Sequence, residues 1–358
     1  MVAIRFLIPG NVRHSSGGNK YNAKLAEHLS ALGANVEVRT VDGGWPVGRT
    51  EDRGRLAGEL DGATTVIADG LVACGAPDEI AEATRGAARV WILSHARLTG
   101  HPDLETRALK AAAGIICTSS HAAAELTFAY GVDDILVATP GVEPVEIASG
   151  SQPPRIIAVA ALLPNKDQML LVEALNELRD LPWTAALIGN MHADSAYAAK
   201  VRAAVVGLGL EGRIAITGEL SGSRLEQEWR AADLSVLVSK SETFGMVVTE
   251  SLAHGLPVLV RKGTGAVEAL GDSGAGAALR LGHGPEPLAR ALESWLRNAA
   301  LRQTWRAAAL RARDVLPGWD STASTVLEAL LAAPRQQIRA IPTPGLPLMP
   351  GKRCRMGP

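Results

Sequence analysis

The sequence predicts an α/β protein built from two doubly wound parallel sheets. Short runs of aliphatic and β-branched residues alternate with longer amphipathic segments along the chain, as in repeated βα units. At 358 residues the chain is too long for one ordinary domain and about right for two. A segment rich in Pro, Ser and Gly, residues 143–154, lies near the middle and indicates a linker between them.

The first half alternates regularly between strand and helix. A β-type run at 2–8 stops at Pro9-Gly10, and a helical pattern of Tyr21, Leu25, Leu29 and Leu32 follows and ends at Gly33. The remaining strands are expected at 36–40, 65–68, 90–93, 114–118 and 135–138. The remaining helices are expected at 53–60, 76–84, 108–113 and 122–130, the last capped by Ser119-Ser120.

The second half repeats the alternation without repeating the sequence. Its strands are expected at 155–160, 184–188, 214–217, 234–238 and 258–260. Its helices are expected at 168–178, 195–208, 223–232, 245–254, 287–299, 301–315 and 321–331. Residues 335–358 contain five Arg or Lys, no acidic residue and five prolines, and we interpret them as a disordered basic tail.

Composition excludes several classes of protein. A net charge of −1 argues against a nucleic-acid-binding protein with a broad basic face. Cys74, Cys117 and Cys354 form no Cys-x-x-Cys pair, and we expect them to be reduced thiols in the cytoplasm. The chain has no apolar run of about eighteen residues and begins directly with a strand, so neither a transmembrane helix nor a signal peptide is expected.

The most informative stretch runs from Ser239 to Val260. Glu242 lies in the loop after a predicted buried strand, and Glu250 lies eight residues on, inside the next helix. Ligands bind at the carboxyl ends of strands in open α/β sheets, and a helix start attracts phosphate. Two carboxylates beside a bound phosphate can accept hydrogen bonds from hydroxyl groups. The stretch therefore indicates a sugar nucleotide, although two glutamates at this spacing also occur in an ordinary βαβ turn.

With Phe244-Gly245 and the segment Gly255-Leu256-Pro257-Val258, this stretch resembles the retaining glycosyltransferases of family 4, which have the GT-B fold. The resemblance implies two Rossmann-like domains that face a central cleft, an acceptor-side domain at 1–142 and a donor-binding domain at 155–318. It also implies that residues 319–334 form a closing helix that crosses back to the first domain. Residues 263–268 are similar to the Gly-Gly-x-x-Glu segment of the family.

The resemblance also assigns site residues, each of which has a plainer interpretation. A Gly-Gly pair after the first strand is common in flexible loops, a strand-end histidine is often a core residue, and a lysine in a βα loop is often solvated. In the family, these positions face the donor phosphate, the transferred sugar and the donor diphosphate. The implied catalytic residues are His95 and Glu242, and the implied donor-binding residues are Gly17, Gly18, Lys166, Gly189, Gly218, Glu219, Phe244, Gly245, Met246, Val247 and Glu250.

The sequence departs from the family pattern at one important point. The family usually places an arginine five residues before the lysine or directly before it, but here these positions are Ala161 and Asn165. The site is therefore one positive charge short for stabilising a departing diphosphate. Arg261 or Lys262, after the strand at 258–260, is a candidate to supply that charge. The loop after His95 also departs from the family pattern.

The expected reaction is metal-independent, retaining transfer of a hexose-type sugar from a UDP- or GDP-linked donor to a hydroxyl acceptor, with no cofactor. No Asp-x-Asp motif follows a strand, as a metal-bound sugar nucleotide in the other main transferase fold would require. Residues 1–150 carry 13 basic and 18 acidic side chains, a net charge of −5 that disfavours anionic lipid. We therefore expect a small soluble acceptor, such as an amino sugar or another natural-product intermediate, and leave peripheral membrane contact open.

Three alternatives were weighed against this function. A sugar-nucleotide epimerase on the same fold would place acid–base carboxylates and histidines in the cleft. A catalytically silent sugar-nucleotide-binding subunit is favoured by the missing arginine. A Rossmann oxidoreductase is disfavoured because no Gly-x-Gly-x-x-Gly follows the first strand.

Overall fold

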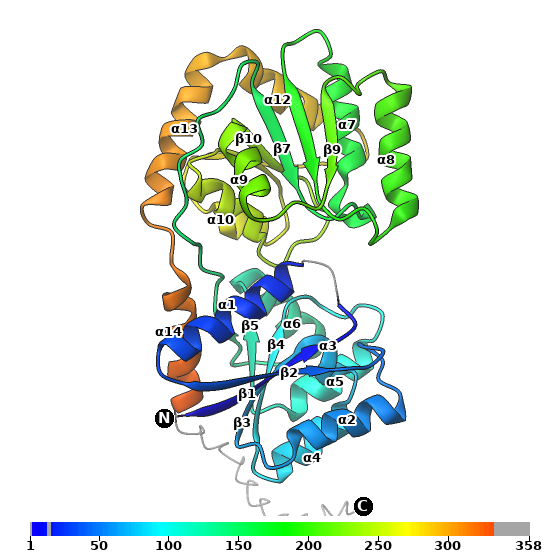
Figure 1. The fold of residues 1–358 in the computed structure, drawn as a ribbon, viewed down its shortest axis with the longest axis vertical. Helices are drawn as coiled ribbons and strands as arrows, with labels where there is room; N and C mark the ends of the chain where they lie inside the picture. Colours follow the sequence, from blue (N-terminus) through cyan, green and yellow to red (C-terminus); the bar gives the residue numbers. More distant parts are fainter. Residues whose placement is uncertain (1, 13–15, 333–358) are drawn as a thin grey trace, which may run out of the picture.

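The protein consists of two six-stranded parallel sheets, each covered by helices on both faces (Figure 1). Residues of both halves line a cleft between them. This computed structural model describes residues 2–12 and 16–332. The predicted α/β fold with two doubly wound sheets is confirmed. The predicted tail at 335–358 lies outside the described residues.

The first sheet contains the strands of the N-terminal half in the order β2-β1-β3-β4-β5-β6. Strand β1 pairs in parallel with β2 along its whole length, from Ala3 opposite Asn35 to Pro9 opposite Val41. The strands are β1 (Ala3–Pro9), β2 (Asn35–Val41), β3 (Thr65–Asp69), β4 (Arg89–Ser94), β5 (Gly114–Cys117) and β6 (Leu136–Val137).

Six helices connect these strands. They are α1 (Gly17–Ala31), α2 (Thr50–Leu60), α3 (Gly70–Cys74), α4 (Pro77–Arg85), α5 (Pro102–Ala111) and α6 (Ser120–Tyr130). The short helix α3 was not predicted. It begins because the carboxylate of Asp69, at the end of β3, accepts a hydrogen bond from the Leu71 N–H at 2.9 Å. Cys74 and Cys117 are buried free thiols in this domain.

The second sheet contains the remaining strands in the order β12-β11-β10-β7-β8-β9. They are β7 (Arg155–Val159), β8 (Thr184–Ile188), β9 (Ile214–Gly218), β10 (Leu234–Leu237), β11 (Val258–Arg261) and β12 (Gly276–Leu279). The edge strand β12 was not predicted, because its sequence Gly-Ala-Ala-Leu has no β-branched residue.

The helices of the second half follow the prediction, with one short addition. They are α7 (Gln168–Glu177), α8 (Ser195–Gly207), α9 (Gly222–Ala231), α10 (Met246–Ala253), α11 (Ala266–Leu270), α12 (Glu286–Arg297), α13 (Ala299–Arg313) and α14 (Trp319–Leu331), with a 3₁₀ turn at Pro164–Lys166. The five-residue α11 was not predicted. The largest core of the protein lies in this half, and Trp183 and Trp295 are completely buried in it.

The chain passes between the two halves twice, at Val142 and Gly318, which form a parallel bridge. At the second crossing α14 returns to the first half and packs against α1 (Figure 1). Trp319 at its start meets the Tyr21 ring edge-on, with ring centroids 5.3 Å apart. These contacts hold α14 on the first domain.

Candidate active site

Sheet topology places a cleft where the two halves meet. In the second sheet β7 pairs with β8 on one side and with β10 on the other, so the direction of winding reverses between β7 and β10. Such reversal points open a crevice at the carboxyl ends of the strands. The loops after β7 and β10 border this crevice, and the loops after β1, β3 and β4 face it from the first half. The cleft has a volume of about 520 Å³.

The N-terminus of α10 forms one wall of the cleft. Gly245 precedes the helix in the left-handed region with φ of 85°, and no side chain caps the helix start. The first backbone N–H groups of α10, at Met246 and Val247, therefore lack intrahelical acceptors, and both residues line the cleft. This arrangement suits a phosphate group, because free N–H donors and the positive end of the helix dipole point to the same place.

The loop before α10 is held by a close backbone contact from the segment after β11. The Gly265 N–H donates to the Glu242 carbonyl at 2.7 Å. A Cβ atom on Gly265 would lie only 2.0 Å from the Thr243 carbonyl oxygen, so only glycine fits there. This glycine belongs to the segment that resembles Gly-Gly-x-x-Glu, and it fixes the position of Glu242.

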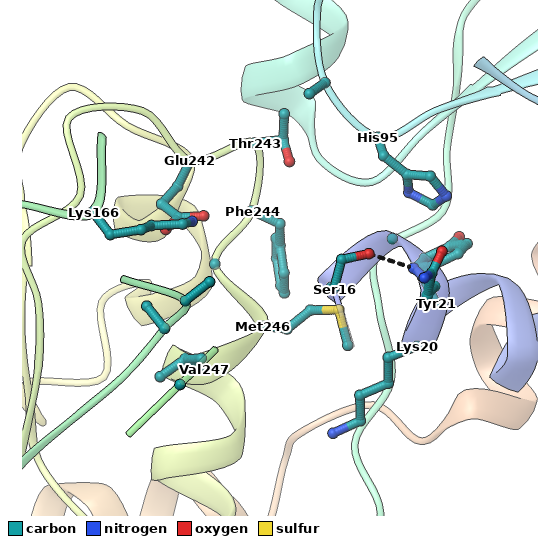
Figure 2. A pocket seen from close by; sticks show the side chains of 18 of the residues that line it. Ser16, Lys20, Tyr21, His95, Lys166, Glu242, Thr243, Phe244, Met246 and Val247 are labelled. Atoms are coloured by element: carbon teal, nitrogen blue, oxygen red, sulfur yellow. Dashed lines mark hydrogen bonds and ion pairs between the residues drawn. The ribbon is translucent and has the colours of Figure 1, made fainter. Parts of the chain in front are cut away.

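Lys166 and Glu242 form an ion pair on the same wall, with Nζ and Oε1 2.6 Å apart. Their side chains are 22% and 13% exposed, so the pair is partly shielded from water. Figure 2 shows the two side chains lying together, opposite His95 and Lys20 across the cleft. The two loops at the reversal point thus bring together one cation and one carboxylate that the sequence separates by 76 residues.

Glu250 lies one turn into α10, and its carboxylate Oε1 contacts the ammonium group of Lys20 from α1. This contact joins the two halves across the cleft. Lys20 was not among the predicted site residues. The signal that could have identified it is its position two residues after Gly17-Gly18, in the first turn of a helix that begins at the cleft.

On the first-domain wall, a chain of hydrogen bonds orients His95. The Asn22 side-chain N–H donates to the Asp69 carboxylate at 2.8 Å, because a carboxylate can only accept. The Asn22 carbonyl oxygen therefore accepts from His95 Nε2–H at 2.7 Å, which leaves Nδ1 of the neutral ring as an acceptor. Burial lowers the pKa of His95, and the nearby Asp69 carboxylate raises it by a smaller amount. Sequence reasoning found His95 but not Asn22 and Asp69.

Gly17 and Gly18 lie at the start of α1 and line the cleft. A Cβ atom on Gly18 would lie 3.1 Å from Cδ2 of His95, so the second glycine leaves room for the imidazole ring. A Cβ atom on Gly17 would lie 3.8 Å from the Met246 sulfur of the opposite domain. Gly18 therefore permits close packing of His95, whereas a Cβ atom on Gly17 would make only an ordinary contact.

Three of the four remaining predicted positions line the cleft. Gly189 and Glu219 line the cleft, and Asn190 donates to the Glu219 carboxylate at 2.7 Å. Gly189 also permits a close approach, because a Cβ atom there would lie 1.9 Å from the Ala160 carbonyl oxygen. Phe244 lines the cleft beside Gly245, whereas Gly218 lies outside its lining.

The expectation that Arg261 or Lys262 supplies the missing charge is wrong. Arg261 is 9% exposed, and its guanidinium donates to the carbonyl oxygens of Val238 and Leu281 and, at 2.6 Å, to the Asp167 carboxylate. These bonds hold it inside the second domain. Lys262 is exposed, and neither residue lines the cleft.

A second set of contacts joins the two halves beside the cleft. Both carboxylate oxygens of Glu268 accept hydrogen bonds from the first N–H groups of α6, those of Ser120 and His121, each at 2.9 Å. The Ser119 hydroxyl donates to the Thr243 carbonyl. Glu268 therefore caps a helix of the other domain, and the contact brings the loop before α10 against the first sheet.

The described residues contain neither a cluster suited to a metal ion nor a helix suited to a membrane span. In 2–12 and 16–332, no group of three or more His, Cys, Asp or Glu side chains is arranged to hold a metal ion. In the same part of the chain, no helix combines the length and the apolar character that a membrane span requires.

Comparison with known proteins agrees with this architecture. A sucrose-phosphate synthase from Thermosynechococcus elongatus has the same fold, with a TM-score of 0.78, 16% identity, and coverage of 92% of this chain and 98% of that chain. Anabaena Alr3699/HepE, solved in complex with UDP and glucose, gives a TM-score of 0.75 at 16% identity, covering 92% and 99%. The two sheets and the cleft between them therefore have the GT-B fold.

Residues 143–312, somewhat less than half of the chain, match the family described as "Glycosyl transferases group 1". A D-inositol 3-phosphate glycosyltransferase from Kineococcus radiotolerans is 29% identical over 253 residues, which cover 63% of this chain and 58% of the relative. The corresponding protein of Arthrobacter sp. is 30% identical over 254 residues, covering 66% and 59%. The chain thus spans less than two thirds of the length of these relatives.

Proposed function

We propose that this protein is a retaining glycosyltransferase that moves a hexose-type sugar from a nucleotide diphosphate sugar to a hydroxyl acceptor without a metal ion. The observation that carries the proposal is the group of three features at the reversal point of the second sheet. These are the uncapped start of α10, the Lys166–Glu242 pair and the Glu250 carboxylate. Together they offer a phosphate site flanked by two carboxylates that can accept hydrogen bonds from hydroxyl groups of the donor.

The donor fits this wall in one orientation. Its diphosphate accepts hydrogen bonds from the N–H groups of Met246 and Val247 and from the ammonium group of Lys166. The Glu250 carboxylate accepts hydrogen bonds from the ribose hydroxyls, and the Glu242 carboxylate accepts hydrogen bonds from hydroxyls of the sugar. The donor is linked to UDP or GDP, and the complexes of Anabaena Alr3699/HepE with UDP and UDP-glucose support UDP.

The reaction breaks the bond between the anomeric carbon and the diphosphate oxygen and forms a bond between that carbon and the acceptor oxygen. The acceptor proton passes to the departing phosphate, so no separate base is required. Positive charge on the sugar develops near the carboxylate of Glu242, and negative charge develops on the diphosphate beside Lys166 and α10. Nδ1 of His95 accepts a hydrogen bond from the sugar and fixes its orientation.

The acceptor enters from the first domain. The residues on that wall include Asp69 and His95, and residues 1–150 carry a net charge of −5. This charge disfavours anionic lipid and favours a small neutral or cationic acceptor in the cytoplasm, such as an amino sugar. Transfer that occurs only to acceptors embedded in liposomes would exclude this acceptor class.

One alternative function has specific support. Ala161 and Asn165 line the cleft where related enzymes carry arginine, and Arg261 is bound to Asp167 and so cannot replace it. This charge deficit favours a subunit that binds sugar nucleotides without turnover. An epimerase remains the other candidate on this fold, and its products would appear in incubations with donor alone.

A direct test uses the purified protein with UDP-glucose, UDP-N-acetylglucosamine and GDP-mannose, a panel of amino-sugar and polyol acceptors, and EDTA. The proposal predicts nucleotide diphosphate release that depends on acceptor, resists EDTA and yields a product with the anomeric configuration of the donor. The Glu242→Gln variant serves as the inactive control. Donor binding without turnover would favour the silent subunit.

A further inference from the structure

The described lining of the cleft is poor in positive charge for a site that binds a diphosphate. Its charged side chains, histidine aside, are two lysines, Lys20 and Lys166, and four carboxylates, those of Asp69, Glu219, Glu242 and Glu250. Lys166 alone on the second-domain wall faces a leaving group that carries at least two negative charges. Since Arg261 points away, the second cation in the described lining of the cleft is Lys20, which comes from the first domain.

Lys20 is placed to reach the diphosphate. The next two residues anchor its backbone, because the Tyr21 hydroxyl donates to the Ala138 carbonyl at 2.8 Å and Asn22 bonds to Asp69. Tyr21 and Asn22 are buried, whereas the Lys20 side chain is 46% exposed and crosses the cleft to Glu250. A fixed backbone with a long, mobile side chain allows the ammonium group to change partners without movement of α1.

The two partners lie close together along α10. Glu250 follows Met246 by four residues, a rise of about 6 Å along the helix, which is within the swing of a lysine side chain. The incoming ribose hydroxyls need the same Glu250 carboxylate that Lys20 contacts. Donor binding therefore displaces the ammonium group at the moment when a diphosphate arrives about one turn away.

We propose that Lys20 is the second cation for the donor diphosphate, and that it leaves Glu250 for the diphosphate when the donor binds. The inference rests on the proposed function, since it names a further residue of the same site. Because Lys20 belongs to the first domain and the diphosphate is held by the second, the exchange also links the two domains through the donor. Lys20 thus supplies the charge absent at Ala161 and Asn165.

The exchange makes a distinctive prediction about ligands. Binding of a nucleoside breaks the ion pair between Lys20 and Glu250 and supplies no new anion, so the ion pair lowers the affinity for a nucleoside. A nucleoside diphosphate restores a partner, so Lys20 favours its binding. Removal of Lys20 should therefore weaken binding of the diphosphate and leave binding of the nucleoside unchanged or tighter, whereas loss of a merely structural residue would weaken both.

The experiment is titration calorimetry with UDP, GDP, uridine and guanosine on the whole protein and on Lys20→Ala, Lys20→Met, Lys20→Arg and Lys24→Ala. Lys24 is the matched control, because it lies one turn further along α1 and pairs with Glu27 and Glu143 instead of a cleft residue. We expect Lys20→Ala and Lys20→Met to weaken binding of the preferred diphosphate about tenfold, as for a lost charge-assisted contact. Binding of the nucleoside should be unchanged or tighter, Lys20→Arg should retain most of the affinity, and Lys24→Ala should match the wild type.

Each outcome decides the question. Equal diphosphate affinity in the wild type and both neutral variants overturns the role of Lys20, as does an equal loss of affinity for nucleoside and diphosphate. In steady-state kinetics of the Lys20 variants, a rise in the KM for the acceptor with no change in the KM for the donor overturns it as well, since Lys20 would then act on the acceptor. If the wild type binds none of the four ligands, the proposed function itself fails, and this result is distinguishable because it does not involve the variants.

Discussion

Substitution of Gly265 by alanine tests how the loop before α10 is positioned. The new Cβ atom would lie 2.0 Å from the Thr243 carbonyl oxygen and 2.8 Å from the Phe244 nitrogen, whereas ordinary contacts begin at 3.4 Å. The Thr243 carbonyl must therefore move by roughly 1.4 Å, since backbone cannot rotate away as a flexible side chain does. The same shift breaks the hydrogen bond from the Gly265 N–H to the Glu242 carbonyl.

The consequences for stability and activity can be estimated separately. Overpacking of this kind costs about 1–3 kcal/mol in the free energy of unfolding. A displacement of about 1 Å at a reacting group lowers activity by roughly a hundredfold, so kcat/KM should fall far more than the stability loss alone explains. Urea unfolding measures the first quantity, and acceptor-dependent release of nucleotide diphosphate measures the second.

Gly212→Ala is the matched control, because its Cβ atom meets nothing within 4 Å in a turn of the same domain. It should leave both quantities close to those of the wild type. If Gly265→Ala unfolds at the wild-type urea concentration and retains wild-type kcat/KM, the reasoning about this contact is wrong. A loss of stability with unchanged activity would show that Glu242 does not depend on the loop position.

Three further predictions concern charged groups. Replacing Lys166 by methionine should lower kcat about a hundredfold or more, because it removes the second-domain cation from the leaving group, and steady-state kinetics with saturating donor measures this. Replacing Arg261 by methionine should cost about 1.5–3 kcal/mol in urea unfolding, because it removes a charged hydrogen bond and leaves the mostly buried Asp167 carboxylate with only the exposed Lys240 ammonium as a partner. Burial lowers the pKa of His95 in the folded state, so the unfolded chain takes up its proton first as the pH falls below about 6.5. The free energy of unfolding should therefore fall with pH there, by up to about 1.4 kcal/mol per pH unit more in the wild type than in His95→Asn.

Each of these predictions has a contrary result. An unchanged kcat in Lys166→Met would place the leaving-group charge elsewhere. A loss of less than about 1 kcal/mol in Arg261→Met would mean that water reaches Asp167 and screens it. Parallel pH profiles for the wild type and His95→Asn would show that the imidazole titrates normally in the folded protein.

The regular part of the fold could be predicted because each long element carries its own periodic signal. The strand at Thr184–Ile188 was predicted at its observed bounds, since a buried strand is continuously apolar. The five-residue α3 and α11 were missed because they are too short for a period to show, and the edge strand β12 was missed because its sequence has no β-branched residue. Their positions are set by tertiary contacts, such as the Asp69 carboxylate at the start of α3.

The site was predictable where its residues follow one another in the sequence. Glu242, Gly245 and Glu250 lie on one loop and helix, so a local motif contains them. Lys20 could not be found in this way, because it meets Glu250 only after both domains fold and the cleft forms between them. Arg261 was wrongly predicted to supply charge to the site. It is near the site residues in sequence, but its hydrogen bond to the Asp167 carboxylate holds it inside the second domain.

The measurement that tests the central claim most directly is a thermal-shift screen with UDP, GDP, ADP and dTDP and their sugars. It is performed with and without EDTA, on the wild type and on Glu250→Ala. A donor at about a hundred times its Kd adds roughly 2.7 kcal/mol to the stability of the native state. We predict that one nucleotide family stabilises the wild type, that EDTA does not change the effect, and that Glu250→Ala abolishes it. No shift with any nucleotide would contradict the account, because the cleft between the two sheets would then not be a donor site.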